Sequence, residues 1–406
     1  MRILHVIIRL GEDCGGPTHG LAALARAQAT MGDEVTILPC CTLEGEKKVL
    51  EQGLQGGLLV LPPAIRGNLG LYSPAVDRAV LRAAANADII HVHGTWRCHL
   101  MAASRAARKL GVPWVVRPAG NLGRIPRSIK RFSKWLYLTL IERRAIERAS
   151  ALHCCTAKEL EEVLELGLHP RHFIIPQPVE DALAAIDVPA GEFERACPGI
   201  GPGDDVVLYL GRLTAIKQLE VLVEAFTRIA RRFLAAHLVL AGPLEDRQLC
   251  ERLRHLAREG GVAQRMHMPG LVRGATKAAV FRRATVFVQP SRHENFGLST
   301  AEALLFGRTC IVNSGVALSD EIAAAGAGIR YSGGAQELVG PLEQALSDAS
   351  FREACQRNAQ RLSRNYRPGV VAGQLRREYQ QCLGHPPVAA AAADPSAEAG
   401  TSRRRA

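Results

Sequence analysis

The sequence predicts an α/β protein with two doubly wound domains that face a cleft, and three observations support this. Short apolar runs alternate with helical patterns through most of the 406 residues, as in the βαβ units of parallel sheets covered on both faces. These runs form two series of about equal size. A stretch rich in proline, glycine and acid separates them, which is typical of a linker. Ligands bind such sheets at the carboxyl ends of the strands, so we look for functional residues there.

The two series of apolar runs predict one sheet in each domain. In a first domain of residues 1–182, the expected strands are residues 3–8, 34–38, 57–61, 89–93, 114–117 and 151–155. A linker at residues 183–204 leads to a second domain of residues 205–365. Its expected strands are residues 206–209, 237–241, 266–268, 286–289 and 310–313.

The C-terminal part of the chain predicts helices and then a tail. The helical stretch 336–362 precedes an amphipathic helix at 370–382, within the segment 366–384. Residues 385–406 have too little apolar variety to pack, so we expect a disordered tail.

Composition excludes several classes of protein. Hydrophobic residues are 47%, charged residues 22% and aromatics 5%, which excludes a disordered, collagenous or fibrous chain. The eleven cysteines include no Cys-x-x-Cys motif, which favours small buried hydrophobes in a reducing compartment over disulfides or zinc. No apolar stretch approaches the length of a membrane span, and the N-terminus reads as a buried strand without a signal cleavage site. We therefore expect a cytoplasmic protein.

The net charge of +12 is concentrated in one window. Residues 97–148 contain thirteen lysines and arginines but only two acids, Glu142 and Glu147. The rest of the chain is near neutral. This distribution favours one localised anionic partner over a uniform nucleic-acid coat, and we expect no nucleic-acid partner.

Two adjacent glycines, Gly15 and Gly16, stand between the first expected strand and a helix. Glycines before a helix N-terminus let a phosphate or sugar approach the backbone amides. A tight strand-to-helix turn explains the same pattern equally well.

In the second domain, Arg212 and Lys217 follow a buried strand and stand five residues apart. A guanidinium fork and an ammonium group in one loop can neutralise a diphosphate. Taken singly, each is more often a solvated charge at the start of a surface helix.

Glu294 and Glu302 stand eight residues apart across an expected strand-turn-helix, with Glu302 expected in the first helical turn. Carboxylates accept hydrogen bonds from sugar and ribose hydroxyls, and the amides near Gly297 and Leu298 can address phosphate oxygens. The alternative is a capping box at Ser299-Thr300-Ala301-Glu302, in which Glu302 only completes the helix end.

From about residue 1 to 384 the chain resembles the retaining, nucleotide-sugar-dependent glycosyltransferases of glycosyltransferase family 4, which have the GT-B fold. Each matching piece is common, but their order over nearly the whole chain is specific. The matching pieces are Gly15-Gly16, residues 88–94, Gly211-Arg212 with Lys217, residues 241–243, Pro269-Gly270, and Pro290-Ser291 followed by Glu294 and Glu302.

The resemblance implies a hexosyltransferase that moves a sugar from a nucleotide-sugar donor to a glycan or lipid-linked acceptor, in cell-envelope or extracellular polysaccharide synthesis. The family assigns Arg212 and Lys217 to the donor diphosphate and Glu302 to the ribose. It assigns Glu294, with the backbone of Asn295, Phe296, Gly297 and Leu298, to the transferred sugar. Gly16 completes the donor site, Arg212, Lys217 and Glu294 carry the chemistry, and the last helix crosses back to the acceptor-binding first domain.

Two positions depart from the family pattern. Many members have a histidine that positions the sugar where this chain has Ala119, and we expect His93, Arg117 or Asn121 to take over that contact. The family's Lys-Gly pair is Lys217-Gln218 here. No suitably placed Asp-x-Asp pair is present, and we expect no metal and no further cofactor because the cation pair supplies the charge.

Residues 124–148 mix cations with aromatic and aliphatic residues. Ile129, Phe132, Leu136 and Leu140 recur near helical spacing, which suits a basic amphipathic helix that binds an anionic membrane surface and makes the protein peripheral there. A core helix with a solvated basic face fits the same pattern.

Three other classes remain open on the sequence. A nucleotide-sugar epimerase of GT-B fold would share the two domains, although it would not favour the four charged residues together. A catalytically silent binding subunit would explain Ala119. A nucleic-acid-binding protein would fit the net charge, but no recognised binding motif accompanies the basic window.

Overall fold

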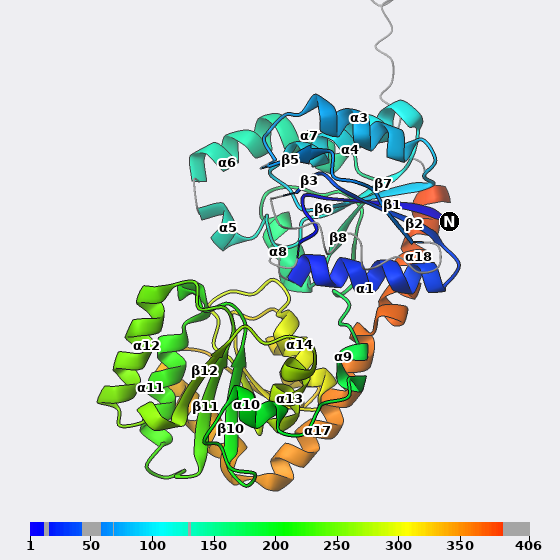
Figure 1. The fold of residues 1–406 in the computed structure, drawn as a ribbon. Helices are drawn as coiled ribbons and strands as arrows, with labels where there is room; N and C mark the ends of the chain where they lie inside the picture. The colour runs from blue at the N-terminus through cyan, green and yellow to red at the C-terminus, as the bar shows by residue number, and fades with distance from the viewer. Residues whose placement is uncertain (12–15, 43–57, 68, 129–130, 385–406) are drawn as a thin grey trace, which may run out of the picture.

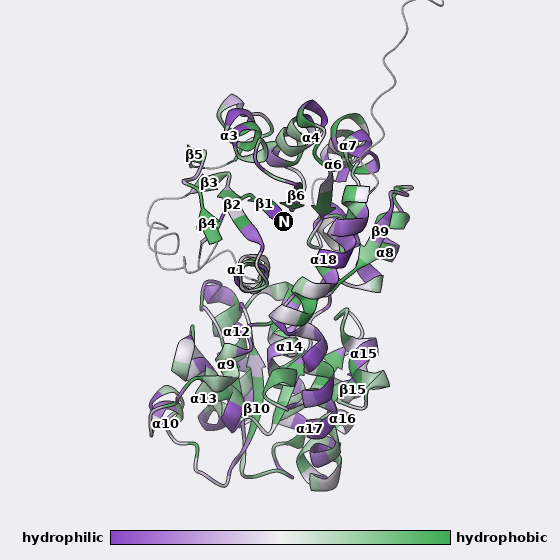
Figure 2. Ribbon diagram, turned by 90° about the vertical axis from the view of Figure 1, so that its right-hand side faces the viewer, coloured by the Kyte–Doolittle hydropathy of each residue, from purple (hydrophilic) through white to green (hydrophobic). Residues whose placement is uncertain are grey.

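A computed structural model describes residues 1–11, 16–42, 58–67, 69–128 and 131–384, and it contains two stacked α/β domains (Figure 1). Each domain has a parallel sheet between layers of helices. The expected fold class is therefore confirmed. Helix α1 of the first domain and α14 of the second lie at the junction of the domains (Figure 2).

The first domain has a seven-stranded sheet in the order β4-β2-β1-β6-β7-β8-β9, with every pairing parallel. Its strands are β1 (Arg2–Ile7), β2 (Glu34–Pro39), β4 (Leu58–Val60), β6 (Ile89–His93), β7 (Trp114–Arg117), β8 (Ala151–Cys154) and β9 (His172–Ile174). Its helices are α1 (Gly16–Thr30), α3 (Pro74–Ala84), α4 (Cys98–Leu110), α5 (Arg124–Ser128), α6 (Arg131–Tyr137), the π-helical turn η2 (Leu138–Glu142), α7 (Arg143–Glu147) and α8 (Ala157–Leu164). A separate pair consists of β3 (Cys41–Thr42) and β5 (Ile65–Arg66).

The second domain has a six-stranded parallel sheet in the order β12-β11-β10-β13-β14-β15. Its strands are β10 (Asp205–Leu210), β11 (Ala236–Ala241), β12 (Met266–Gly270), β13 (Val286–Gln289), β14 (Thr309–Asn313) and β15 (Gly328–Tyr331). Its helices are α9 (Ala182–Ala185), α10 (Glu192–Ala196), η3 (Ala215–Lys217), α11 (Leu219–Ile229), α12 (Arg247–Glu259), η4 (Ala263–Arg265), α13 (Gly274–Arg283), α14 (Leu298–Leu305), α15 (Ser319–Ala324), α16 (Ala335–Ser347), α17 (Ala349–Ser363) and η5 (Arg364–Tyr366).

All eleven expected strands are present, with ends shifted by two residues or fewer. The structure adds β9 and β15 at the sheet edges and the small pair β3 and β5. The expected helical stretch 336–362 is two helices, because Asp348 has an extended backbone and its side chain caps α17 by accepting from the amide of Phe351 (2.8 Å).

The segment expected as a linker packs onto the second domain. Phe193, Cys197 and Ile200 are 5%, 0% and 5% exposed and belong to the same apolar cluster as Phe281. The proline and glycine content of residues 183–204 concealed these three apolar side chains. The expected linker is thus largely part of the second domain's core.

The last helix, α18 (Pro368–Gly384), crosses back to the first domain as expected (Figure 1). Val371, Leu375 and Tyr379 are fully buried with Leu21 and Leu24 of α1 in the first domain's core. At its end, Glu378 accepts from Arg171 next to β9 (2.7 Å). The expected disordered tail at 385–406 lies outside the described residues.

Ten free cysteines are buried in the described part of the chain, as expected, and Cys14 lies outside it. Burial is the main cause that raises the pKa of several of these thiols, for example that of Cys155 to about 11. Among the described helices, none combines the length and the apolar character needed to cross a bilayer.

Candidate functional site

The strand order places two functional loops beside each other at the carboxyl edge of the second sheet. Strand β10 pairs with β11 on one side and with β13 on the other, so the chain order reverses between β10 and β13. Ligands bind at such a reversal point in open α/β sheets. The loop after β10 carries Arg212 and Lys217, and the loop after β13 carries Glu294.

Arg212 presents an exposed guanidinium at this edge. Its backbone carbonyl accepts a hydrogen bond from the buried Tyr209 hydroxyl (2.9 Å), which anchors the loop. Among the described residues, its side chain has no hydrogen-bond or ion-pair partner. An anchored backbone with an unused guanidinium is suited to an anion from solution.

Lys217 forms an ion pair with Glu294 and thereby joins the two loops. Both side chains are largely buried, at 14% and 18% exposure. Lys217 ends η3, whose Ile216 carbonyl accepts from the amide of Arg292 (3.0 Å) and so fixes the distance between the loops. Glu294 also accepts from Gln289 Nε2 (2.9 Å) and Ser291 Oγ (3.0 Å), so its orientation is fixed.

Three of the four predicted charged residues therefore meet at one edge. Burial raises the pKa of Tyr209 well above its ordinary value of 10.0, Glu294 raises it further and Arg212 opposes the rise. Tyr209 thus lies within electrostatic range of both groups.

Helix α14 begins directly beyond these loops, at Leu298. Gly297 precedes it with a φ of +90°, a left-handed conformation that a residue with a side chain rarely adopts. The first amides of a helix have no intrahelical acceptor, so α14 offers them at the site. The Phe296 side chain is buried against Tyr366 and only its backbone is available, whereas Leu298 packs partly against the core.

Glu302 lies in the second turn of α14, not in the first, and its carboxylate pairs with Lys277 Nζ (2.6 Å) from α13. The capping-box alternative is wrong, because Gly297 is the capping residue and no side chain caps this helix. Sequence reasoning missed Lys277, which belongs to no recognised motif. Lys277 and Glu302 form a second charged pair on the α14 side of the sheet edge.

The first domain contacts this site through Asn295. Thr156 Oγ1 donates to the Asn295 carbonyl (3.2 Å). With its amide nitrogen toward Glu159, the Asn295 side chain donates to Glu159 Oε1 and accepts from the Gly120 amide, both at 3.3 Å. Lys158 Nζ also donates to the carbonyls of Ser314 and Gly315 (3.2 and 3.3 Å). The predicted sugar-binding loop is therefore part of the domain interface.

Of the three expected replacements for the family histidine, two are buried. Arg117 is 1% exposed, and its guanidinium donates to Gln177 Oε1 (2.8 Å) and Cys155 Sγ (3.2 Å). His93 is 3% exposed. Asn121 is half-buried, and its carbonyl accepts from Trp96 Nε1 (2.8 Å). Only Asn121 of these three has a partly exposed side chain, while Ala119 itself has a left-handed φ of +53°.

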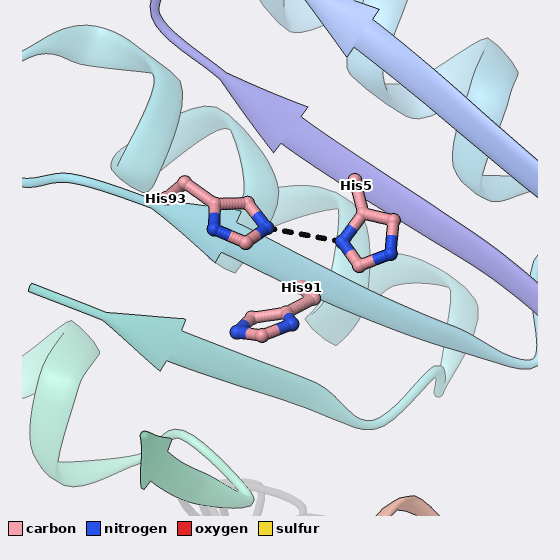
Figure 3. A group of neighbouring side chains, drawn as sticks. All are labelled: His5, His91 and His93. Carbon is pink, nitrogen blue, oxygen red and sulfur yellow. Dashed lines mark hydrogen bonds between the residues drawn. The ribbon is translucent and has the colours of Figure 1, made fainter. Parts of the chain in front are cut away.

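His93 belongs to a network of buried histidines beneath the first sheet's carboxyl edge (Figure 3). His5 Nε2 donates to Gln28 Oε1 (2.8 Å), so its Nδ1 accepts from His93 Nε2 (3.0 Å). His153 Nε2 donates to the Ile175 carbonyl (2.8 Å), so its Nδ1 accepts from His91 Nε2 (3.3 Å). His91 Nδ1 then accepts from Tyr379 of α18 (2.6 Å). These bonds assign one proton to each ring and tie the crossover helix to the sheet.

The trio His5, His91 and His93 is close enough to hold a metal ion by distance alone. However, both nitrogens of His5 and of His91 already form hydrogen bonds, and Arg117 lies within electrostatic range of all three rings. A cation would break these bonds and meet a buried positive charge. We therefore interpret the cluster as a hydrogen-bonded core, with His93 in a supporting role.

These histidines predict marked acid sensitivity. Burial lowers the pKa of His5 and His99 to about 4 and of His153 to about 3, and those of His91 and His93 fall well below 6.5. Below pH 6.5 these histidines become protonated in the unfolded chain but stay neutral in the folded core. The free energy of unfolding therefore falls as the pH falls. We expect Tm in calorimetry to drop by more than about 10 °C between pH 7 and pH 5. The exposed His255→Asn variant should follow the same profile, and a flat profile would contradict the assignment.

Sequence reasoning missed a buried carboxyl in the first domain that anchors the loop after β6. Glu142 is 0% exposed, ends η2 and accepts from the amide of Trp96 (2.7 Å). Burial raises its pKa to about 8. Trp96 has a left-handed φ of +71° and packs beside Tyr137. Strained backbone and π-helical turns are frequent at functional sites. Here the hydrogen bond from the Trp96 amide to Glu142 of η2 fixes the loop after β6.

Gly16 is the first residue of α1, as expected for a glycine at a helix start. Gly15 lies outside the described residues. The neighbouring Gly20 packs against Gln177, the residue that holds Arg117, which places the start of α1 beside the buried guanidinium.

Comparison with known proteins gives two family models that together span most of the chain. Residues 15–177 match the glycosyl transferase 4-like domain, and residues 192–362 match glycosyl transferases group 1. The D-inositol 3-phosphate glycosyltransferase of Jonesia denitrificans is 26% identical over 390 residues, covering 87% of this chain and 88% of the relative. That of Acidothermus cellulolyticus is 27% identical over 372 residues, covering 81% and 79%.

Solved structures share the fold. Anabaena HepE in complex with UDP superposes with a TM-score of 0.76 at 17% identity, over 94% of this chain and all of that chain. Sucrose-phosphate synthase from Thermosynechococcus elongatus superposes with a TM-score of 0.74 at 18% identity, over 95% of this chain and all of that chain.

The two facing parallel-sheet domains with a crossover helix define the GT-B class of glycosyltransferase. The chain belongs to the glycosyltransferase family 4 type within that class. The expected family and the expected enzyme class, a hexosyltransferase, are both confirmed.

Proposed function

We propose that this glycosyltransferase moves a hexose, with retention of anomeric configuration, from a nucleoside-diphosphate sugar to a glycan or lipid-linked acceptor of cell-envelope or extracellular polysaccharide synthesis. Names of relatives favour this setting: they include D-inositol 3-phosphate glycosyltransferases and the serotype-specific mannosyltransferase of Escherichia coli. HepE has been solved with UDP-glucose.

The observation that carries the proposal is the joined pair of loops at the second sheet's reversal point. Arg212 is exposed and has no hydrogen-bond or ion-pair partner among the described residues, and Lys217, in the same loop after β10, is held in place by Glu294. A diphosphate entering here meets two cations and the first amides of α14. Glu302, held by Lys277, is our candidate for the ribose hydroxyls.

The reaction itself needs stabilisation of the leaving diphosphate. Negative charge grows on the diphosphate as the anomeric carbon gains oxocarbenium character, and preoriented cations and amides stabilise that charge. Glu294, fixed by three partners, would hold the sugar hydroxyls. We propose that no metal is needed, because Arg212 and Lys217 supply the positive charge that a divalent ion would otherwise provide.

The experiment is a thermal-shift panel of UDP, GDP and ADP with UDP-glucose, GDP-mannose and ADP-glucose, followed by a chelator control. A ligand that binds only the folded state raises Tm by mass action. We expect one nucleotide series to raise Tm and released diphosphate to appear with an acceptor. Conversion of the sugar nucleotide without release of diphosphate would favour the epimerase alternative, and binding without turnover would favour the silent subunit.

We further propose that the first domain docks on an anionic membrane surface, and the α5–η2 region supports this. Figure 1 shows α6 at the outer side of the first domain, away from α18. Phe132, Trp135 and Leu140 are 72%, 59% and 70% exposed, and α6 buries no residue. This exposure argues against the core-helix alternative; Ile129 and Lys130 lie outside the described residues. Arg131 and Lys134 belong to the same helix α6, and Arg124, which pairs with Glu165, begins α5.

Vesicle sedimentation tests this docking. Each exposed ring or leucine inserted in the interface is worth up to about 1.5–3 kcal/mol, and each cation about 1 kcal/mol on an anionic surface. We expect binding to phosphatidylglycerol vesicles but not to phosphatidylcholine vesicles, and loss of most binding in the double variant Phe132→Ser and Leu140→Ser. Leu234→Ser, on the other domain and 77% exposed, is the matched control. Failure of the wild type to bind either vesicle would remove the membrane from the proposal.

A further inference from the structure

A buried carboxyl of the first domain reaches the loop of the second domain that carries Glu294. Glu159 lies in the first turn of α8 and is 2% exposed. Its Oε1 accepts from the amide of Gly120 (2.5 Å), and its Oε2 accepts from the amide of Cys155 (2.7 Å). When the Asn295 amide nitrogen faces it, Oε1 also accepts from that nitrogen (3.3 Å). One carboxyl therefore contacts three segments of the chain, and one of them belongs to the other domain.

Helix capping alone does not account for this arrangement. Residues 156–159 have the pattern of a capping box, in which the glutamate accepts from the backbone amide of the threonine. Thr156 does cap α8, because its hydroxyl accepts from the Glu159 amide (3.2 Å). The Glu159 carboxyl, however, accepts from Gly120 and Asn295, which both lie outside the helix. The carboxyl is thus directed at the domain interface.

The first domain holds Asn295 at both its backbone and its side chain. Thr156 Oγ1 donates to the Asn295 carbonyl (3.2 Å), while Glu159 accepts from the side chain. Gly120 packs directly against the same residue, since a Cβ atom built on Gly120 would lie 2.7 Å from Asn295 Cβ and 2.9 Å from its Cγ. Gly120 also has a left-handed φ of +81°. This close approach leaves Asn295 little freedom to move while the domains are in contact.

The place of Asn295 in the chain connects this contact with the sugar site. Asn295 directly follows Glu294 and shortly precedes α14, so a shift of Asn295 would displace both the carboxylate and the amides that face the donor. On the first domain, Glu159 fixes the amide of Gly120, which is next to Ala119 at the position of the family histidine. Hydrogen bonds weaken steeply with distance and angle, so displaced groups bind sugar hydroxyls less tightly.

We propose that Glu159 is a positioning residue for the transferred sugar and acts through Asn295 of the opposite domain. It holds the loop at Gly120 and the loop at Asn295 in one arrangement, so the two halves of the sugar site are aligned only when the domains are in contact. This inference rests on the proposed function, because the sugar reaches the Glu294 loop only if the diphosphate binds at the edge of the second sheet.

The partners of Glu159 need an acceptor on both of its oxygens. Burial raises the pKa of its carboxyl, whereas its three hydrogen-bond donors and the charge of Arg117 lower it. A glutamine has nearly the same shape, but it offers one acceptor oxygen and turns an NH₂ donor toward one of the backbone amides. Glu159→Gln therefore disrupts the contact without leaving a large cavity.

Calorimetric titration of the full chain tests this role. The ligands are UDP with UDP-glucose, GDP with GDP-mannose, or ADP with ADP-glucose, whichever pair the wild type binds. Glu159→Gln and Asn295→Ala should each weaken sugar-nucleotide binding by about tenfold, but change nucleoside-diphosphate binding by less than about twofold. Asn295→Ala removes the partner on the other domain, so it keeps the test decisive if Glu159→Gln fails to fold.

The double variant shows whether Glu159 acts through Asn295. Its loss of sugar-nucleotide affinity should be close to that of the more impaired single variant, because removing either partner breaks the same contact. Glu161→Gln, an exposed carboxylate on the same helix, should bind both ligands as the wild type does.

Three results would overturn the positioning role and leave the diphosphate site intact: losses that multiply in the double variant, equal weakening of the two ligands, or no weakening of either. Failure of the wild type to bind any of the three nucleoside diphosphates would overturn the proposed function and the positioning role together. The two failures are therefore distinguishable.

Discussion

Replacing Arg212 with alanine is expected to lower kcat/KM by about 10²–10³-fold while leaving Tm unchanged. The guanidinium has no partner among the described residues, so the folded enzyme loses no contact there. The leaving diphosphate loses a preoriented donor, and removal of one such donor typically costs this much. Steady-state kinetics and calorimetric melting on the same sample measure both quantities.

The companion variant Lys217→Ala is expected to affect both catalysis and stability, in contrast to Arg212→Ala. It should lose a similar factor in kcat/KM, but it should also lower Tm, because Glu294 is 18% exposed and loses its cation. Arg232→Ala, an exposed arginine of the same domain, should change neither quantity. An Arg212→Ala enzyme with wild-type kinetics would contradict the assigned role.

Replacing Gly242 with alanine is expected to destabilise the second domain by about 2–3 kcal/mol and to lower kcat/KM by about 10²-fold. A Cβ on Gly242 would overlap the carbonyl oxygen of Gly211 and lie 2.9 Å from Leu213 Cδ1. Backbone cannot move aside as a flexible side chain can, so the loop that carries Arg212 must shift. A displaced loop misaligns the guanidinium with the diphosphate.

The control for this steric argument is Gly203→Ala. A Cβ there would meet no atom within 4 Å, and the residue precedes the same sheet. Chemical denaturation should show Gly203→Ala close to wild type and Gly242→Ala with a lower midpoint. Equal stability of the two variants would contradict the close packing of Gly242 against Gly211.

The sequence predicted the sheets well because buried parallel strands are continuous apolar runs that composition alone reveals. Strands β9 and β15 escaped detection because they are short edge strands, and only Phe173 of β9 is buried. The prediction that residues 183–204 form only a linker was wrong because this segment shows no helical or strand period. Its three buried apolar side chains are irregularly spaced among proline and glycine: Phe193, Cys197 and Ile200.

The candidate site was predictable only in part. Arg212, Lys217 and Glu294 follow strands at the reversal point, and their order along the chain was enough to bring them together. Periodicity could not show that α6 exposes its apolar side chains, because an amphipathic helix has the same pattern on a core or on a surface. Pairings between distant segments, such as Lys277 with Glu302 or Glu142 with Trp96, leave no local signal.

Gln218 replaces a glycine of the family pattern, and the effect of this replacement could be judged only from the backbone conformation in the structure. The family's glycine at this position suggested lost flexibility, and the structure shows Gln218 in a left-handed conformation with a φ of +50° at the start of α11. The backbone thus keeps the conformation that glycine favours, at a cost of about 1 kcal/mol. Lys217 keeps its place in the ion pair with Glu294.

The most direct test of the donor site is a crystal structure of the enzyme with the nucleoside diphosphate that it binds. We predict phosphate oxygens within hydrogen-bonding distance of the Arg212 guanidinium and Lys217 Nζ, with the first amides of α14 facing the same group. A diphosphate bound elsewhere, for example on the basic surface of residues 124–148, with Arg212 still free, would contradict the account.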